Sequence, residues 1–346
     1  MPKVTINDIA RRAGVSKGAV SYALNGRAGV SESTRARILQ VADELGWAPN
    51  RTARMLSGSR SGAVGLVLSR DPAILGTEPF YMQFVAGLER VLAMHSYGLM
   101  LQMTPDLAAE MDTYRAWASE RRVDAAIVLD LRVDDPRITL FAELELPAVF
   151  VGSPSLTGGF SSVWTDDAAA MVAAVDHLAD LGHKRIARVA GTSDHGHVKI
   201  RTAAFKAQVK ARGLRGKVMH ADFTAERGRE LTAKLVQSKN PPTAIIFDND
   251  LMAVAGLAEL SRLGIQVPED MSVLAWDDST LCRLTEPPLS AMSHDVAGYG
   301  ALVGQVLFKI LADGERMSQA DAPLQLQIRG STGAPGICAS AAGSPA

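Results

Sequence analysis

The sequence predicts a small helix-turn-helix domain followed by an α/β domain of two lobes. Residues 4–57 form short helical segments with a basic charge. From Ser61 onward, short apolar runs alternate with amphipathic stretches, and the alternation restarts once near residue 165. Apolar strands that alternate with amphipathic helices are typical of a parallel sheet covered by helices, and two sets indicate two such sheets.

Three short helices are expected within residues 1–48. Thr5, Ser16 and Ser31 precede their first turns, and a hydroxyl at this position can accept from the free N–H groups of a helix start. The segment Ala13-Gly14-Val15-Ser16 separates the first two helices. Its glycine can adopt the left-handed conformation that ends one helix before the next begins, as in a helix-turn-helix.

The first 60 residues carry most of the positive charge. They contain ten Lys and Arg against four Asp and Glu, a net charge of +6, so the other 286 residues carry about −7 of the overall −1. A basic segment of this kind is suited to nucleic-acid phosphates. The polar face of the second helix suits a DNA groove, because it combines one cation, hydrogen-bonding groups and a glycine that permits close approach.

The sequence resembles the lac repressor family (LacI/GalR) of bacterial transcription factors over nearly its whole length. The resemblance rests on TINDIARRAGVS at 5–16, VSESTRARI at 30–38, LGHKRIARVAG at 181–191, PPTAIIFDNDLMA at 241–253 and VPEDMSVLAWDD at 267–278. It implies a two-lobed effector domain like the periplasmic binding proteins. It also implies that Lys17, Gly18 and Tyr22 select bases in the major groove. The implied contacts with backbone phosphates are Thr5, Ser16, Ser21, Asn25, Ser31 and Thr34.

Residues 49–61 are expected to form a hinge helix and a linker. A helix of about eight residues is too short to persist alone in water, so it needs a partner. The resemblance implies that two such helices pair in the minor groove of an operator and that Leu56 is inserted between base steps, which bends DNA. Asn50, Arg51 and Arg54 would then contact the operator. The end of this segment, rich in Ser and Gly, is expected to be a flexible tether.

Residues 62–330 are expected to form the effector-binding and dimerisation domain. The first lobe would comprise about 62–161 and 291–320, and the second about 162–290 and 321–330. The expected strands lie at 63–68, 98–103, 125–131, 148–152, 186–191, 217–222, 244–250 and 272–278. The expected helices lie near 80–95, 114–115, 141, 168–181, 199–212, 226–236, 251–263 and 294–311.

Ligands of doubly wound sheets bind beyond the carboxyl ends of the strands. The polar candidates there are Ser69-Arg70, Asp130, Ser153, residues 192–197, Asp222-Phe223, residues 248–250 and Asp277-Asp278. The family resemblance implies that Arg201 and Asp277 clasp ligand hydroxyls, assisted by Asn249. It also implies that Phe223, Phe80 and Tyr81 supply aromatic walls, and that the loop containing His195 and His197 reaches the pocket.

An Arg and Asp pair with aromatic faces suits a sugar, because both charged groups can form paired hydrogen bonds with hydroxyls. A sugar effector is expected to act as an inducer. A purine or nucleoside stacked on the same aromatic rings, acting as a corepressor, is the alternative. An architectural DNA binder insensitive to ligand is a further alternative, which would have no use for the cleft.

Catalytic and metal sites are disfavoured by the sequence. Asp277 and Asp278 are adjacent on an extended segment and point to opposite faces, so they cannot flank one glycosidic bond. Asp250 is expected to cap the following helix rather than to bind a metal with Asp248. His195-Gly196-His197, without a carboxylate at ligand spacing, is read as a flexible polar loop. The sequence therefore predicts neither an enzyme nor a cofactor.

The remaining features concern location and assembly. The sequence shows neither an export signal nor a run near the roughly 20 apolar residues of a membrane span, so a cytoplasmic, nucleoid-associated protein is expected. The segment 331–346, rich in small residues, is expected to be disordered. Tetrameric members of the family that the sequence resembles carry a leucine heptad tail, and none occurs here. The resemblance therefore implies a homodimer on a pseudopalindromic operator, with its interface on first-lobe helices such as 84–91.

Replacement of Leu56 by Ala tests the expected wedge in the minor groove. We expect weaker operator binding, since the apolar side chain that separates the base steps is lost, with effector binding unchanged. Fluorescence anisotropy with a labelled operator duplex measures the first quantity and calorimetry the second. Equal operator affinity of both proteins would refute the wedge.

Overall fold

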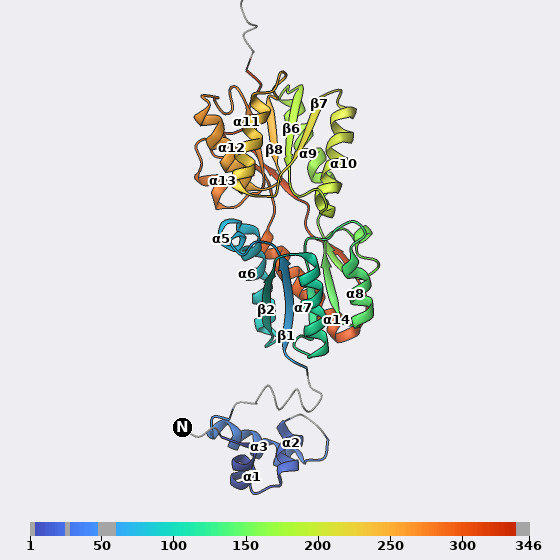
Figure 1. The fold of residues 1–346 in the computed structure, drawn as a ribbon. Coiled ribbons are helices and arrows are strands. Elements are labelled where there is room, and N and C mark those ends of the chain that lie inside the picture. Colours follow the sequence, from blue (N-terminus) through green and yellow to red (C-terminus); the bar gives the residue numbers. More distant parts are fainter. Residues whose placement is uncertain (1–3, 25–27, 48–59, 337–346) are drawn as a thin grey trace, which may run out of the picture. The chain divides into compact units, whose positions relative to one another are not determined.

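The computed structural model describes residues 4–24, 28–47 and 60–336, and it divides the chain into two compact units, residues 1–61 and 62–346. Each unit is described by itself (Figure 1). Asn25, Asn50, Arg51, Arg54 and Leu56, which the sequence assigns to DNA binding, lie outside the described residues.

The N-terminal unit contains the expected helix-turn-helix. Its helices are α1 (Ile6–Ala13), α2 (Lys17–Leu24) and α3 (Glu32–Glu44). Ile9, Val20 and Ile38, one from each helix, are fully buried together and hold the helices at fixed angles. Gly14 has φ +67°, which only glycine adopts without strain, and this conformation ends α1.

The expected caps are formed. Ser16 Oγ accepts from Ala19 N at 3.1 Å, and Ser31 Oγ accepts from Thr34 N at 3.3 Å. Thr5 forms a capping box with Asp8, whose carboxylate accepts from the Thr5 N–H at 3.0 Å. These bonds satisfy N–H groups that a helix start leaves free, so the short helices begin at defined residues.

The second unit consists of two lobes, each built on a six-stranded sheet (Figure 1). The first sheet has the order β11-β5-β4-β3-β1-β2 and is parallel throughout. Its strands are β1 (Ala63–Ser69), β2 (Gly98–Thr104), β3 (Ala125–Val128), β4 (Ala148–Val151), β5 (Ser161–Trp164) and β11 (Ser318–Ala320). Its helices are α5 (Ile74–Thr77), α6 (Pro79–Met94), α7 (Leu107–Ser119), α8 (Pro136–Leu144), the short 3-10 helix η1 (Pro154–Leu156) and α14 (Val296–Asp313).

The second sheet has the corresponding order β12-β10-β9-β8-β6-β7, and only the pair β10 and β12 is antiparallel. Its strands are β6 (Arg185–Ala190), β7 (Arg215–His220), β8 (Ala244–Phe247), β9 (Ser272–Asp277), β10 (Ser290–Ser293) and β12 (Gln325–Gln327). Its helices are α9 (Asp167–Asp180), α10 (Gly196–Ala211), α11 (Ala225–Val236), α12 (Asp250–Arg262) and α13 (Thr280–Leu284). The predicted doubly wound lobes are therefore present, although the helices α5 and α13 and the strands β5, β10, β11 and β12 were not predicted.

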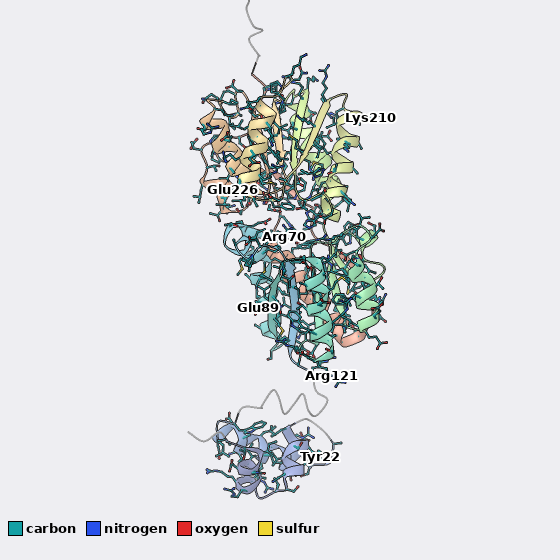
Figure 2. All side chains as sticks on the ribbon, viewed as in Figure 1. Tyr22, Arg70, Glu89, Arg121, Lys210 and Glu226 are labelled. Atoms are coloured by element: carbon teal, nitrogen blue, oxygen red, sulfur yellow. The ribbon has the colours of Figure 1, made fainter. Side chains whose placement is uncertain are left out.

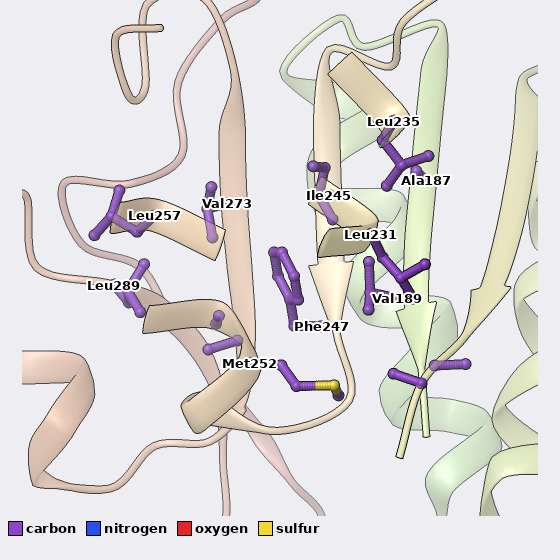
Figure 3. Packing of buried hydrophobic residues seen from close by; sticks show 14 of the residues in the cluster. Ala187, Val189, Leu231, Leu235, Ile245, Phe247, Met252, Leu257, Val273 and Leu289 are labelled. Carbon is purple, nitrogen blue, oxygen red and sulfur yellow. The ribbon is translucent and has the colours of Figure 1, made fainter. Parts of the chain in front are cut away.

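Strand periodicity places apolar side chains on both faces of each sheet. In β1, Val64, Leu66 and Leu68 face one core, whereas Val67 faces the other. The second lobe has the same arrangement, and Figure 3 shows Phe247 of β8 among side chains of neighbouring strands and of the covering helices. A sheet covered on both faces requires the near-continuous apolar runs that the sequence shows.

Three chain crossings connect the lobes, and two of them lie slightly later than expected. Strand β5 belongs to the first sheet and β10 to the second, so the boundaries lie after 164 and 293 rather than at 161 and 290. The third crossing follows β11, close to the expected position. The shift arises because each crossing follows the last hydrogen-bonded residue of a strand, which an apolar pattern alone does not locate.

Helices α6 and α14 form the tightest helix pair of the first lobe. A Cβ atom at Gly87 would lie 1.8 Å from Ala297 O, and one at Gly300 would lie 2.1 Å from Phe84 O, so only glycine permits this approach. By length and composition α14 could span a membrane, but eight of its residues are buried, as expected of a core helix.

The segment 84–91, expected at a dimer interface, is mostly internal. Phe84, Leu88 and Val91 are buried in the first lobe because α14 covers them. The exposed face of α6 instead carries Met82, of which 46% is exposed, and Arg90. That face is the part of the helix available to a second subunit.

The expectation of disorder from residue 331 is wrong for residues 331–336. Ser331 is fully buried, and its backbone and hydroxyl bond to Val273 and Ser290. Gly333 bonds to Ser272 and to His183, which the sequence assigned a structural role. These backbone groups find partners in the second sheet, which small residues can approach closely.

Two truncations test the contribution of this segment. Removal of residues 331–346 should lower the free energy of unfolding by about 3 kcal/mol or more, because buried donors and acceptors of β9 and β10 lose their partners. Removal of residues 337–346 alone keeps all of these bonds and is the control. Urea unfolding followed by tryptophan fluorescence measures the effect, and identical midpoints for the two truncations would contradict it.

Candidate functional site

The surface of α2 presents the residues assigned to base recognition. Lys17 and Gly18 are exposed. Tyr22, which Figure 2 labels, is 44% exposed. A Cβ atom at Gly18 would contact only Ser16 Oγ at 3.7 Å, so the backbone there is open to a close partner. Thr5, Ser16 and Ser31 are exposed as well, and Ser21 and Thr34 are partly exposed. The surface of α2 thus offers one cation, Lys17, and several hydrogen-bonding groups lie on it and near it.

A pocket lies between the two lobes, where the carboxyl ends of their strands meet, and its cavity volume is about 100 Å³. Seven of the eight residues predicted to bind the effector line it: Phe80, Tyr81, Asp130, His197, Arg201, Phe223 and Asp277. The sequence analysis left the following lining residues unassigned: Glu78, Thr165, Asp167, His294, Tyr299 and Leu324.

Arg70 and Asp130 form the charged centre of the first lobe's wall. Arg70 Nε donates to Asp130 Oδ2 at 2.9 Å, and the Tyr81 hydroxyl donates to the same oxygen at 3.0 Å. Burial alone would raise the pKa of Asp130, but Arg70 and then His195 hold it well below its usual range. Asp130 is therefore an ionised acceptor. Figure 2 places Arg70 at the junction of the lobes.

The segment 194–197 is ordered, contrary to the expected flexible loop. His195 is 6% exposed and precedes the first turn of α10, and its Gly196 neighbour donates from N to Leu131 O of the other lobe at 2.6 Å. Burial lowers the pKa of His195, and burial followed by Arg201 lowers that of His197 well below its usual range. Both rings are thus neutral at neutral pH.

Besides the adjacent Asp194, a carboxylate that is distant in sequence, that of Asp130, lies close to these histidines. Ligand atoms of Asp130, His195 and His197 lie within 4.8 Å of one another. Arg70, however, donates to Asp130 and lies 3.4 Å from His195 Nδ1. A metal ion here would have to displace a guanidinium, which disfavours the site for cations.

Phe223 forms the apolar wall of the second lobe. Its backbone has φ +70°, and its ring lies against the end of β6, where a Cβ atom at Gly191 would come within 1.9 Å of the ring. The Arg70 guanidinium lies 5.0 Å from the ring centroid on the other lobe's side. Glycine at 191 therefore sets the depth of the pocket.

Arg201 is held in a fixed orientation. Its Nε donates to Asp167 Oδ1 at 2.7 Å, and its guanidinium lies 4.1 Å from the centroid of Trp276. Asp167 opens α9 directly after the first crossing. Arg201, Asp167 and Asp277 all line the pocket, so the predicted contacts of Arg201 and Asp277 with ligand hydroxyls remain a prediction.

Asp277 and Asp278 point in different directions, as expected for adjacent residues. Asp278 accepts from Arg329 Nη2 at 2.9 Å, whereas Asp277 faces the pocket. Burial raises the pKa of Asp277 well above its usual range, and nearby Arg201 only partly offsets this effect. The pair cannot act as two catalytic carboxyls on one bond.

The predicted roles of Asn249 and Asp250 are corrected by the structure. Asn249, fully buried, caps α12 by accepting from Met252 N at 2.9 Å and donates to Phe223 O at 3.0 Å. Its side chain is absent from the pocket lining. Asp250 is the first residue of α12 and not its cap. Asn249 takes the cap position, where its side-chain amide can both accept and donate a hydrogen bond.

Glu78 is the most unusual acid of the pocket. It precedes α6, yet its side chain does not cap that helix, and Oε1 lies 3.5 Å from Asn249 Nδ2 of the other lobe. Its Oε2 is buried without a hydrogen-bond partner among the described residues. Burial raises the pKa of Glu78 to about 7.

Asp167 was predictable, since it follows the apolar Ser161–Trp164 segment as the other candidates follow their strands. The sequence indicates Glu78 as a pocket residue more weakly, because the Pro79 that follows it marks a helix start rather than a strand end. Tyr299 and His294 had none, since they enter from α14 and the second crossing, far along the chain.

Known proteins share both units of this chain. Residues 5–50 match the family of bacterial regulatory proteins called lacI, and residues 175–332 match the periplasmic binding protein-like domain. The transcriptional regulator CelR of Thermobifida fusca is 31% identical over 89% of this chain and 91% of its own length. The catabolite control protein A of Priestia megaterium is 28% identical over 89% and 92%.

Solved structures agree in fold over nearly the whole chain. The lac repressor dimer bound to operator and the anti-inducer ONPF gives a TM-score of 0.83 at 25% identity, covering 96% of this chain and 100% of its own. The CelR complex with cellobiose gives 0.73 at 28% identity, covering 95% and 100%. These likenesses define a DNA-binding transcriptional regulator with a periplasmic-binding-protein-like sensor. The chain belongs to the lacI family.

Replacement of Glu78 by Gln should change the dependence of stability on pH. The folded pKa, about 7, lies above the usual value of 4.5, so the folded protein binds the extra proton and loses stability as pH rises through this interval. Glu78→Gln should therefore be more stable than the parent at pH 8, by roughly 3 kcal/mol, and nearly equal at pH 4.5.

Thermal unfolding at a series of pH values measures this difference. Glu143→Gln, at an exposed position of α8, is the matched control and should show none. A constant difference between Glu78→Gln and the parent from pH 4.5 to 8 would show that Glu78 does not titrate with folding.

Proposed function

We propose that this regulator is a repressor whose operator affinity is controlled by a sugar bound between the lobes, and that the sugar acts as inducer. The observation that carries the proposal is Arg201, fixed by Asp167 above Trp276 and facing the pocket. A preorganised guanidinium with aromatic walls suits hydroxyl groups on one side of a ring and C–H groups on the other.

The aromatic walls come from both lobes. Phe80 and Tyr81 lie in the first lobe and Phe223 and Trp276 in the second, and all four line the pocket. One face of Trp276 is covered by Arg201. The C–H groups of a sugar and a flat purine would both use the ring faces that remain open. The sugar is favoured over the corepressor alternative by Arg201, whose N–H groups suit hydroxyls.

The effector would control DNA binding by changing the relative position of the lobes. A ligand that contacts Arg70 or Tyr81 in one lobe and Arg201 or Asp277 in the other favours the arrangement in which both contacts form. The ligand can shift the equilibrium between the two arrangements of the lobes only to the extent that its affinities for them differ. The first lobe would transmit the shift to residues 49–61, which we propose as the hinge.

The operator contacts are proposed for the exposed face of α2, with Lys17, Gly18 and Tyr22 at the bases. A homodimer would present two such faces to two half-sites. A regulator that acts on bacterial DNA works in the cytoplasm. Its lacI-family relatives are transcriptional regulators, which agrees with the absence of a predicted catalytic function.

The proposal is tested by a thermal-shift screen of mono- and disaccharides, nucleosides and purine bases. A ligand that binds only the native state raises the melting temperature by mass action. A shift with a sugar, together with release of labelled operator, is expected. A shift with purines alone, with tighter operator binding, would favour the corepressor alternative.

Arg201→Ala should abolish the response to the sugar identified in this screen while operator affinity stays within about twofold. The reason is that the guanidinium would contact the effector and not the DNA. Anisotropy titrations with and without the sugar measure both properties. Arg212→Ala, at the exposed end of α10, is the control, and a response that survives in Arg201→Ala would remove this residue from the site.

A further inference from the structure

The two guanidinium groups of the pocket lining are already neutralised by carboxylates. Arg70 pairs with Asp130 at 2.9 Å, and Arg201 pairs with Asp167 at 2.7 Å. Neither cation is therefore free to balance a phosphate or carboxylate carried by a ligand. A third lining acid, Asp248, forms an ion pair with Arg188, which does not line the pocket.

Two lining carboxyl groups remain without a cation. Among the described residues, neither Glu78 nor Asp277 forms an ion pair within 4.0 Å. Glu78 is 6% exposed, and its Oε2 has no hydrogen-bond partner in the described part of the chain. A buried carboxyl group in this condition costs free energy unless a ligand satisfies it.

The two acids approach the pocket from opposite lobes. Glu78 precedes α6 of the first lobe, and Asp277 ends β9 of the second. The charged groups that face Glu78 are Arg70, Asp130, Asp250 and Asp277, and those that face Asp277 are Arg201, Asp250, Glu78 and Asp167. Both arginines donate to other carboxylates, so the net field at Glu78 and Asp277 favours a positive charge.

We propose that the effector is a sugar bearing a free amino group, and that Glu78 and Asp277 together bind its ammonium. This inference rests on the proposed effector function of the cleft. An ammonium offers three donors, enough for Glu78 Oε2 and for Asp277 at once. Its positive charge also stabilises the ionised forms of the two acids, which a neutral hydroxyl cannot do.

The same arrangement selects against anionic ligands. A sugar phosphate or sugar acid would place its charge beside Glu78 and Asp277, while Arg70 and Arg201 are already engaged. Specificity depends on such repulsion as much as on attraction. A neutral sugar should bind with intermediate affinity, because its hydroxyls form uncharged hydrogen bonds that are weaker than charge-assisted ones.

Matched trios of sugars test the inference. Glucose, galactose and the glucose disaccharide cellobiose are each supplied in neutral, 2-amino-2-deoxy and uronate forms. Relative to the neutral member, the amino member exchanges one hydroxyl at C2 for an ammonium and the uronate exchanges one hydroxymethyl group at C6 for a carboxylate. Calorimetry at pH 7 with the full-length protein measures each affinity. In at least one trio the amino member should bind about tenfold or more tighter than the neutral member, and the uronate should bind most weakly.

Variants then assign the preference to its residues. Glu78→Gln keeps the size of the side chain and should reduce the ratio of amino to neutral affinity to about one. Asp277→Asn should reduce the same ratio. Glu143→Gln, exposed and remote in sequence, should keep it. A preference that persists in both Glu78→Gln and Asp277→Asn would overturn the assignment.

The outcomes separate this inference from the proposed function. Tightest binding by the neutral or the uronate member in every trio that binds would overturn the amino sugar while leaving a sugar-responsive regulator. Binding by no member of any trio would overturn both the amino sugar and the sugar effector. Operator binding by the same preparation, measured separately, would still stand as a property of the N-terminal unit.

Discussion

A guanidinium removed from water must be matched by a carboxylate, because an unpaired buried charge costs several kcal/mol. In the cleft of this regulator, sheet topology meets that requirement. Arg70 follows β1 and Asp130 follows β3, and these strands are hydrogen-bonded neighbours. In the second lobe Arg188 of β6 binds Asp248, which follows the neighbouring β8. The strand order therefore places opposite charges side by side, and the polar walls of the pocket depend on it.

Those walls also decide what the pocket can recognise. Because the arginines are engaged, they act on a ligand through their remaining N–H groups and as fixed dipoles rather than as free charges. The aromatic rings that flank them are fixed by close packing, as Phe223 is by Gly191. A rigid pocket of this kind loses little entropy when a small, rigid ring enters, which favours affinity. The flexibility needed for regulation must then reside in the crossings between the lobes rather than in the walls.

The sequence predicted the fold well because strand and helix periods are local signals. The rule that ligands lie beyond strand ends also located Arg70, Asp130 and Asp277, since each follows an apolar run. This rule failed for site residues whose environment is made by another part of the chain. Glu78 precedes a helix rather than following a strand, and its carboxyl group lies against Asn249 of the other lobe. The order of residues 331–336 was missed for the same reason, because small residues become structured only through distant backbone partners.

Glu78 and Asp277 give the cleft a means of coupling charge to lobe movement. They belong to different lobes, and because burial raises the pKa of both groups, the exclusion of water on closure favours their protonated forms. A cationic ligand between them stabilises the ionised forms and makes two charge-assisted contacts. Its affinity then differs strongly between the open and closed arrangements, which is the condition for a ligand to shift their populations. A neutral ligand would make only uncharged contacts with the two acids and would be a weaker effector at equal occupancy. The unsatisfied acid that costs the unliganded protein stability is thus the group that would make its response to ligand large.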